Sequence, residues 1–199
     1  MNNFSNMLLR YFTQDEIQKI QSTKILIIGC GGLGSNLAHS LVRCGFLNIT
    51  LTDFDKVEIS NLNRQFYFLN QIGIYKTQAL KENLLNINPE CQIETINGDI
   101  TKLDLESIIK KYHIVAEALD KPNLKKYVFE VCIKLNKKVV CASGVAGYGN
   151  CENIKITRGR NYVVIGDFIS SIDKFSPLSP KVMAISNIQA DEVLRMVLI

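Results

Sequence analysis

A glycine-rich segment near the N-terminus has the spacing of a phosphate-binding loop. Residues 29–34 read Gly-Cys-Gly-Gly-Leu-Gly and satisfy the pattern G-x-G-x-x-G, between an apolar run and a helical pattern. Glycines permit a tight turn and a close approach of backbone N–H groups to phosphate oxygens, and the N-terminus of the following helix favours negative charge. Asp53 ends the next apolar run about 20 residues further on, where an acidic side chain binds ribose hydroxyls. These residues predict a nucleotide site rather than a merely structural turn.

The polar segment that follows Asp53 adds cations to the predicted site. Arg64 supplies a planar guanidinium fork and Lys76 a compact ammonium, and together they suit a triphosphate. Ser60 or Asn61 would cap a short helix that presents Arg64. The alternative is a solvated loop whose charges have no role. The segment begins at the carboxyl end of a predicted strand, however, which is where α/β sheets bind ligands.

A lone carboxylate, Asp120, ends the segment HIVAEALD and is expected at the same edge of the sheet. Proteins usually hold Mg²⁺ with one or two carboxylates plus substrate phosphates, so Asp120 is predicted to be its ligand.

A nicotinamide-dependent oxidoreductase would instead need a catalytic acid or base, for which only His39 and His113 are available. Both histidines fall on predicted regular elements and are interpreted as structural.

The elements that must position these residues alternate between short apolar runs and helical spacing. Strands are expected at residues 24–29, 48–53, 91–97, 113–119 and 138–142, with helices from 33, over 76–88, over 103–111, from 122 and from 179. Residues 152–157 and 162–165 are expected to form a late antiparallel hairpin. The alternation predicts an α/β fold with a doubly wound, mostly parallel, Rossmann-like sheet and antiparallel strands late in the chain.

Composition narrows the class of protein. The 199 residues, of which 47% are hydrophobic, are enough for one domain over 1–199, with residues 1–22 as an N-terminal arm or helix. The net charge of +4 comes from scattered basic residues, and no apolar run is long enough for a membrane span, so neither nucleic acid nor membrane is an expected partner. Six cysteines without a C-x-x-C pair, and only two histidines, predict no zinc site and a reduced, cytoplasmic location.

Several motifs occur together in the order and spacing of a known family: GCGGLGS at 29–35, Asp53-Phe-Asp55, SNLNRQ at 60–65, Gly73-x-x-Lys76, Asn88-Pro89 and Asp120. From about Leu9 to the C-terminus the chain resembles the ThiF/MoeB-like adenylyltransferases, which are relatives of the ubiquitin-activating enzymes. Within that family it is most similar to the short ThiF form, which activates the sulfur carrier protein ThiS in thiamine (thiazole) biosynthesis. The resemblance implies one ATP-binding domain that uses ATP and Mg²⁺ to adenylylate the C-terminal glycine carboxylate of a ubiquitin-like carrier ending in Gly-Gly.

The resemblance also assigns roles to individual residues. Catalytic roles are implied for Arg10, Arg64, Lys76 and Asp120, with Asp120 as the magnesium ligand. Nucleotide contacts are implied for Gly29, Gly31, Gly32, Gly34, Ser35, Asp53, Asp55, Asn61, Arg64, Gln65 and Lys76. A homodimer is implied, in which Arg10 reaches the partner's nucleotide and the C-terminal helix and N-terminal arm offer apolar surface.

The sequence departs from the family pattern at three points. The two zinc-binding C-x-x-C pairs of longer relatives are missing, Thr13 stands where a second arginine is common, and Lys121 replaces the asparagine that usually follows Asp120. Cys151 is the candidate for a covalent intermediate because it alone among the cysteines falls in an apparent loop. Four alternatives stay open: activation of another, molybdopterin-type carrier, a related ATP-dependent adenylating enzyme, an NAD-dependent oxidoreductase, and a catalytically inactive nucleotide-binding scaffold.

Overall fold

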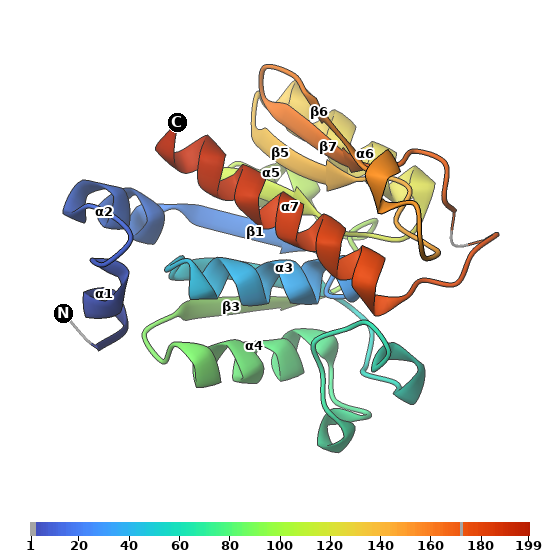
Figure 1. Ribbon diagram of the computed structural model, residues 1–199, viewed down its shortest axis with the longest axis horizontal. Coiled ribbons are helices and arrows are strands. Elements are labelled where there is room, and N and C mark those ends of the chain that lie inside the picture. Colours follow the sequence, from blue (N-terminus) through green and yellow to red (C-terminus); the bar gives the residue numbers. More distant parts are fainter. Residues whose placement is uncertain (1–2, 172) are drawn as a thin grey trace.

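The apolar runs of the sequence form the strands of one twisted sheet (Figure 1). The structure is a computed structural model that describes residues 3–171 and 173–199. The strand order is β3-β2-β1-β4-β5-β7-β6. The strand bounds are β1 Lys24–Ile28, β2 Asn48–Asp53, β3 Gln92–Asn97, β4 Ile114–Glu117, β5 Lys138–Ala142, β6 Lys155–Arg158 and β7 Tyr162–Gly166. All neighbouring strands run parallel except β6, which pairs antiparallel with β7, as the sequence predicts.

Helices cover both faces of this sheet, which is the expected doubly wound arrangement. One face carries α3 Gly32–Arg43, α4 Lys76–Ile87 and α7 Ser179–Leu198, and the other carries α5 Leu105–Ile109 and α6 Pro122–Lys134. Two further helices, α1 Asn3–Leu8 and α2 Gln14–Ser22, precede β1 at the amino edge of the sheet. Strands β1, β4, β5 and β7 are mostly apolar because both faces of a parallel sheet are buried.

Much of the apolar side of the long helix α7 packs within its own chain, while Met183 stays 39% exposed. Its apolar face packs along α3, where Val182, Ile185 and Val193 are buried. A helix with one apolar stripe buries that stripe against the nearest layer, and here the layer belongs to the same chain. Exposed large apolar side chains instead follow β2, in a segment over residues 54–75 that we call the rim segment: Phe54, Ile59, Phe68, Leu69, Ile72, Ile74 and Tyr75.

The predicted hairpin differs from the structure at its first strand. Residues 151–153 form a short 3₁₀ helix, η3 Cys151–Asn153, and β6 begins only at Lys155. Asn150 adopts a left-handed backbone conformation, with φ of 54°, which turns the chain before the strand can start. Two other 3₁₀ turns, η1 Ile59–Asn61 and η2 Leu69–Gln71, lie in the rim segment.

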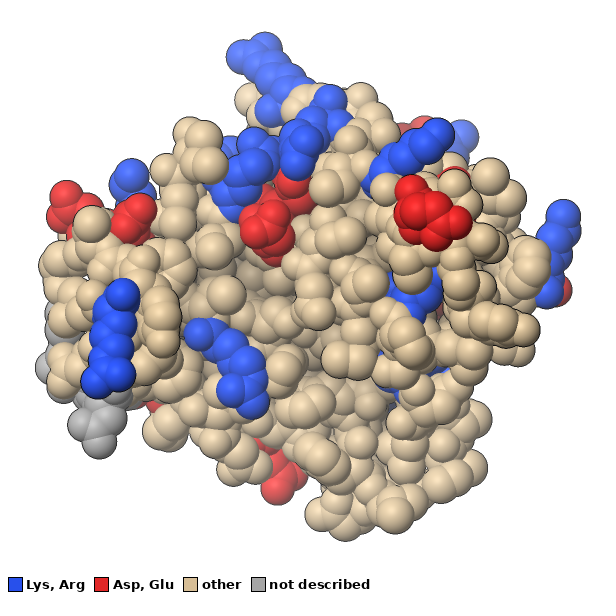
Figure 2. All heavy atoms as spheres, in the orientation of Figure 1, with Lys and Arg blue, Asp and Glu red and all other residues tan. Residues whose placement is uncertain are grey.

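Charges on the face that carries α7 are mixed. Figure 2 shows basic side chains interleaved with acidic ones across this face rather than gathered in one patch. Within residues 3–171 and 173–199, no helix is both long enough and apolar enough to cross a membrane.

Candidate active site

The glycine loop joins β1 to α3 through backbone contacts that exclude side chains. Gly29 has φ of +97°, and a Cβ there would lie 2.7 Å from the carbonyl oxygen of Ala118. A Cβ on Gly34 would lie 1.8 Å from the carbonyl oxygen of Gly29. The turn and the first turn of α3 therefore pack backbone to backbone, beside the carboxyl end of β4.

The middle of the glycine loop faces two residues of the rim segment. A Cβ on Gly31 would meet only the amide nitrogen of Gln65, at 3.9 Å. A Cβ on Gly32 would lie 3.4 Å from Cγ of Arg64 and 2.9 Å from Val182 of α7. Arg64 and Gln65 are therefore brought beside the predicted phosphate loop, as the sequence analysis expects, although they lie some 30 residues away in the chain.

Asp53 connects the glycine loop to the end of β2. Its Oδ2 accepts a hydrogen bond from the backbone N–H of Cys30 at 2.7 Å, and its Oδ1 accepts one from the N–H of Asp55 at 2.9 Å. The side chain is half-buried at the carboxyl edge, which is where its predicted contact with ribose would place it. Each carboxylate oxygen keeps a further acceptor position, so the ribose contact stays a prediction that the geometry permits.

Lys76 stands at the first residue of α4 and pairs with Asp55. Its ammonium lies 2.7 Å from Oδ2 of Asp55, and the lysine is 7% exposed while the aspartate side chain is 48% exposed. The backbone N–H of Lys76 also donates to the carbonyl of Asp55 at 2.9 Å. The lysine is therefore held in place with an exposed counter-ion, which an incoming phosphate could replace.

Arg64 and Asp120 come together from distant parts of the chain. The Arg64 guanidinium donates to the carbonyl of Ser60 at 3.0 Å and to Oδ1 of Asn63 at 2.7 Å. Partial burial lowers the pKa of Arg64, and the nearby negative charge of Asp120 opposes that shift. An arginine guanidinium is always charged in proteins, so Arg64 adds a fixed cation near the Asp120 carboxylate.

Asp120 suits a magnesium ion that is shared with phosphates. It lies in an exposed turn after β4, and in the part of the chain that the structure describes no hydrogen bond or salt bridge engages its carboxylate. No group of three or more His, Cys, Asp or Glu residues among those described could hold a metal by itself. A single hard oxygen donor beside a phosphate loop fits Mg²⁺, which keeps waters and takes phosphate oxygens as its other ligands.

Other predicted contact residues also serve the local structure. Ser35 donates to the carbonyl of Gly31 at 2.7 Å and accepts from the N–H of Phe66 at 3.0 Å, so it joins α3 to the rim segment. Asn61 accepts from the N–H of Glu58 at 3.1 Å, so Glu58 rather than Ser60 or Asn61 occupies the cap position of η1.

Gln65 is the predicted residue whose environment most directly suggests a ligand. It is 8% exposed, and its Oε1 has no hydrogen-bond partner among the described residues. A buried amide atom without a partner costs about 1–3 kcal/mol. Rotation of the amide exchanges its oxygen and nitrogen, so the side chain can present either an acceptor or a donor to a molecule beside Gly31.

Arg10 and Cys151 make none of the contacts described above. Arg10 is an exposed residue of the turn between α1 and α2, and Figure 1 shows these two helices at the amino edge of the sheet, away from the turn between β1 and α3. Cys151 is exposed in η3, whereas Cys30, Cys91, Cys132 and Cys141 are buried and Cys44 is partly buried. Its proposed covalent role stays a prediction.

Sequence reasoning missed several residues that support the site. Asn36 donates to the carbonyls of Gly32 and Arg64 at 2.7 and 2.8 Å, and Tyr67 donates to the carbonyl of Cys30 at 2.7 Å. Glu117, fully buried at the end of β4, accepts from the N–H of Leu119 at 2.7 Å. The signal in the sequence that could have identified them is a polar residue at a position that the apolar pattern assigns to the interior.

A family model described as the ThiF family matches residues 4–198. SUMO-activating enzyme subunit 2 of Dictyostelium discoideum is 36% identical over 143 residues, which are 71% of this chain and 22% of that protein. A probable molybdopterin-synthase adenylyltransferase of Porphyra purpurea is 33% identical over 121 residues, which are 60% of this chain and 32% of that protein. The chain thus spans only about a fifth to a third of the length of these relatives.

Solved structures share the fold over the whole chain. E. coli tRNA N6-threonylcarbamoyladenosine dehydratase in complex with ATP superposes with a TM-score of 0.83 at 19% identity and covers 96% of this chain and 92% of its own. E. coli MccB with ATP superposes with a TM-score of 0.70 at 26% identity and covers 92% of this chain and 57% of its own. Both of these structures are complexes with ATP.

Proposed function

This chain belongs to the ThiF family, and from that premise we propose that it is an ATP-dependent adenylyltransferase acting on the C-terminal carboxylate of a ubiquitin-like carrier protein. The observation that carries the proposal is the convergence of the glycine loop, Arg64, Lys76 and Asp120 at one edge of the sheet. These residues come from four separate segments, and they are the groups that binding and charge neutralisation at a triphosphate require.

The proposed reaction needs little proton transfer. The carrier carboxylate attacks the α-phosphorus of ATP, the bond to the β-phosphate oxygen breaks, and an acyl-adenylate and pyrophosphate are formed. A carboxylate is already ionised at neutral pH, so no general base is required at a site without a histidine. Catalysis then rests on alignment of the reactants and on neutralising the charge that accumulates on the phosphates, which Arg64 and Lys76 are placed to do.

Asp120 would hold magnesium together with phosphate oxygens. When bound, the ion would neutralise negative charge on the phosphates, including the leaving pyrophosphate. Asp55 would give up its contact with Lys76 so that the ammonium can contact phosphate. Gln65, with its unpartnered amide, and Asp53, with its remaining acceptor positions, would complete the contacts to the nucleotide.

We further propose a homodimer in which Arg10 completes the site of the second copy. Arg10 lies between α1 and α2, which Figure 1 shows at the opposite edge of the sheet from the turn between β1 and α3, and a position of this kind suits a contact with a neighbouring molecule. The rim segment supplies exposed apolar surface next to the site, with Phe68 and Leu69 at 52% and 70% exposure. A symmetric dimer would cover such a surface on both copies.

The sulfur carrier ThiS of thiamine biosynthesis is the proposed substrate, on the resemblance to the short ThiF form. A molybdopterin-type carrier is the second candidate, because one relative is a probable molybdopterin-synthase adenylyltransferase. A nicotinamide-dependent oxidoreductase would share the glycine loop and Asp53, but it gives no reason for Arg64, Lys76 and Asp120 at the same edge. An inactive scaffold likewise gives no reason for these three charged residues.

The test is pyrophosphate exchange into ATP with Mg²⁺, with and without purified carriers that end in Gly-Gly. We expect exchange that depends on the cognate carrier, with the ThiS-type carrier giving the highest kcat/KM. A carrier truncated by its last glycine serves as the matched control and should give background exchange. Absence of exchange with every carrier, despite ATP binding by calorimetry, would favour the scaffold and overturn the proposal.

A further inference from the structure

We propose that the buried ion pair between Glu117 and Lys125 is a positioning device that fixes the turn carrying Asp120 against the glycine loop. This inference rests on the function proposed above, because it gives the pair a role in placing the metal-binding carboxylate. Neither residue is among those that the sequence pattern or the resemblance assigns to the site.

The pair is enclosed at the carboxyl end of the sheet. Glu117 is the last residue of β4 and is 0% exposed, and the Lys125 side chain, in the second turn of α6, is 20% exposed. The lysine ammonium lies 3.2 and 3.3 Å from the two carboxylate oxygens of Glu117. It also donates to the carbonyl of Ala142, the last residue of β5, at 2.9 Å. One ammonium thus joins α6 to the ends of two neighbouring strands.

The carboxylate in turn holds the backbone that leads to Asp120. Its Oε1 accepts from the N–H of Leu119 at 2.7 Å, which closes the turn immediately before Asp120. Leu119 is joined to Ala118, whose N–H donates to the carbonyl of Ile28 at 2.9 Å. The carbonyl of Ala118 lies where a side chain at Gly29 would collide with it. The turn held by Glu117 is therefore the one that packs directly against the phosphate loop.

The geometry of the segment 117–125 gives Asp120 little freedom. Glu117 anchors its start, and Lys125 anchors the helix that begins two residues after Asp120, at Pro122. The ion pair between these two ends closes the segment into a short loop with Asp120 inside it. A backbone held on both sides keeps the Asp120 residue close to Gly29 when a nucleotide binds, which is the preorganisation that catalysis by charge requires.

Burying the charges of Glu117 and Lys125 costs free energy, because both groups lose contact with water. Burial raises the pKa of Glu117, and the charge of Lys125 and the N–H of Leu119 oppose that shift only in part. Buried pairs are often replaceable by apolar residues without loss of stability. What an apolar pair could not do is accept the N–H of Leu119 and donate to the carbonyl of Ala142 at the same time.

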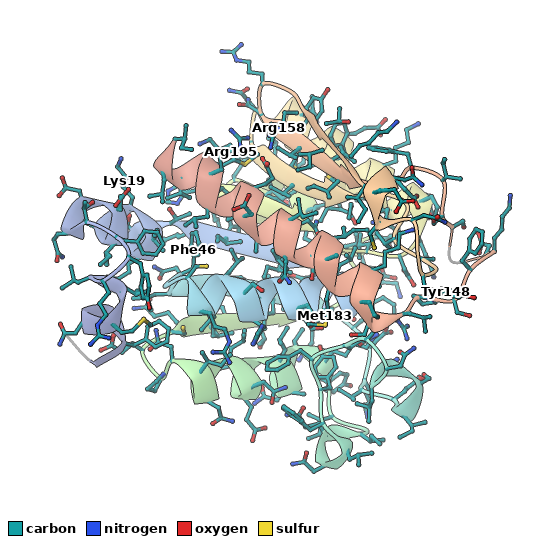
Figure 3. The ribbon with its side chains drawn as sticks, viewed as in Figure 1. Lys19, Phe46, Tyr148, Arg158, Met183 and Arg195 are labelled. Atoms are coloured by element: carbon teal, nitrogen blue, oxygen red, sulfur yellow. The ribbon has the colours of Figure 1, made fainter. Side chains whose placement is uncertain are left out.

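A second buried carboxylate offers a matched control. Glu192 of α7 is 0% exposed and accepts from Arg158 of β6 and from Arg195, at 3.1 and 2.7 Å. Figure 3 shows these two arginines near each other at the far end of α7. Within the described residues, none of these three side chains forms a hydrogen bond or salt bridge with residues 117–120. Replacing Glu192 therefore tests the loss of a buried carboxylate without disturbing Asp120.

The experiment compares Glu117→Gln, Lys125→Met, Lys125→Arg and Glu192→Gln with the unsubstituted protein. Calorimetry measures ATP affinity with and without Mg²⁺, pyrophosphate exchange gives kcat and the KM for carrier, and thermal melting gives stability. For Glu117→Gln and Lys125→Met we expect unchanged metal-free ATP affinity and unchanged KM for carrier. We expect the gain in ATP affinity from Mg²⁺, and kcat, to fall by about 10–100-fold, the usual effect of losing a residue that orients a metal ligand.

Lys125→Arg keeps the positive charge and can still donate to both Glu117 and the carbonyl of Ala142. It should therefore keep most of the gain in ATP affinity that Mg²⁺ gives. Glu192→Gln should lose stability but keep kcat and the Mg²⁺ effect. The proposal is overturned if Glu117→Gln and Lys125→Met melt earlier, as Glu192→Gln does, while the Mg²⁺ effect stays at its original size. If Glu117→Gln does not fold, the proposal is tested by comparing Lys125→Met with Lys125→Arg, using the Mg²⁺ effect on ATP affinity and kcat.

Failure of the proposed function would look different. The unsubstituted protein would then show no exchange with any carrier, but its ATP affinity would still be measured with and without Mg²⁺. A Mg²⁺ effect that Glu117→Gln removes would support the positioning role even so. No Mg²⁺ effect in the unsubstituted protein would overturn the positioning role as well.

Discussion

At the scale of single residues, two charged side chains of the site, Asp53 and Arg64, are held by hydrogen bonds with uncharged groups. Asp53 accepts from Cys30 and Asp55, and Arg64 donates to Ser60 and Asn63. Such contacts fix the position of a charge without neutralising it. The charges therefore stay available for a ligand, in contrast to the enclosed pairs elsewhere in the molecule.

Asp120 is the residue whose loss we expect to affect chemistry more than binding. Asp120→Ala leaves the glycine loop and Asp53 intact, so ATP should bind in the absence of metal with an affinity close to that of the unsubstituted protein. The transition state would lose a preorganised charge, which is worth about 10²–10³ in rate. The measurement is pyrophosphate exchange beside calorimetry without metal. Exchange within a few-fold of the original rate would rule out the assignment.

A buried ion pair near the site makes stability depend on pH. Asp167 and Lys181 are both enclosed, with 6% and 3% of their side chains exposed, and their charged groups lie 2.7 Å apart. Burial alone would raise the pKa of Asp167, but hydrogen bonds from Lys181, Ser170 and the N–H of Ile169 bring it well below its usual value. A carboxyl with a depressed pKa in the folded state contributes stability above its unfolded pKa, near 4, and this contribution is lost as the pH falls.

We therefore expect Asp167→Asn to lower the free energy of unfolding at pH 7 by about 3–5 kcal/mol, since it leaves a buried lysine without its counter-ion. Below about pH 4 the difference from the unsubstituted protein should shrink, because protonation removes the same charge. Urea denaturation at a series of pH values measures this. Glu130→Gln, which breaks an exposed pair with Lys126, is the control and should change little at any pH. A difference for Asp167→Asn that is constant across pH would contradict the account.

At the scale of elements, the strand–turn–helix unit of β1 and α3 sets the shape of the site. Its turn is possible only because two glycines let the backbone of α3 approach that of Gly29 and β4. The helix also carries Ser35 and Asn36, which hold the rim segment by its backbone. The same short element thus forms the phosphate loop and positions the segment that supplies Arg64.

Gly34→Ala should damage this unit severely. Its Cβ would collide with the carbonyl oxygen of Gly29, so α3 must move away from the turn, and such overpacking costs about 1–3 kcal/mol or more. ATP affinity should fall along with stability because the turn itself is displaced. Gly31→Ala is the matched control, since its Cβ meets nothing closer than 3.9 Å and its backbone is not left-handed. Equal melting temperatures for the two variants would show that the close approach is not required.

At the scale of the whole molecule, residues of the proposed site lie at opposite edges of the sheet. The glycine loop and Asp120 follow the carboxyl ends of β1 and β4, while Arg10 lies between α1 and α2, which Figure 1 shows at the amino edge. A symmetric pair of chains would bring the amino-edge arm of each copy to the carboxyl edge of the other. The exposed apolar rim segment lies beside that edge.

This arrangement predicts complementation between two inactive variants. Arg10→Ala and Asp120→Ala should each lose most exchange activity as separate homodimers. After mixing and subunit exchange, half of the dimers would be hybrid, and each hybrid would contain one intact site, so about a quarter of the original activity should return. Sedimentation measures the oligomeric state of the same samples. No recovery in a mixture shown to contain hybrid dimers would place Arg10 outside the partner's site.

The sequence by itself determined the parts of the protein that depend on neighbours along the chain. The alternation of apolar runs and helical spacing determined the strands and helices, and the glycine spacing determined the turn between β1 and α3, because backbone sterics act over a few residues. The order of the motifs also indicated the family that the full-length comparison supports.

Only the tertiary structure decided which charges meet. It brought Asp120 close enough to Arg64 for its charge to act on the guanidinium, enclosed Glu117 with Lys125, and packed much of the apolar face of α7 against α3. It also set α1 and α2, the helices on either side of Arg10, at the opposite edge of the sheet from the turn between β1 and α3. These outcomes depend on which strands become neighbours and how the layers pack. Interactions between residues far apart in the chain form only when the backbone closes the long loops between them, and no local pattern encodes that choice.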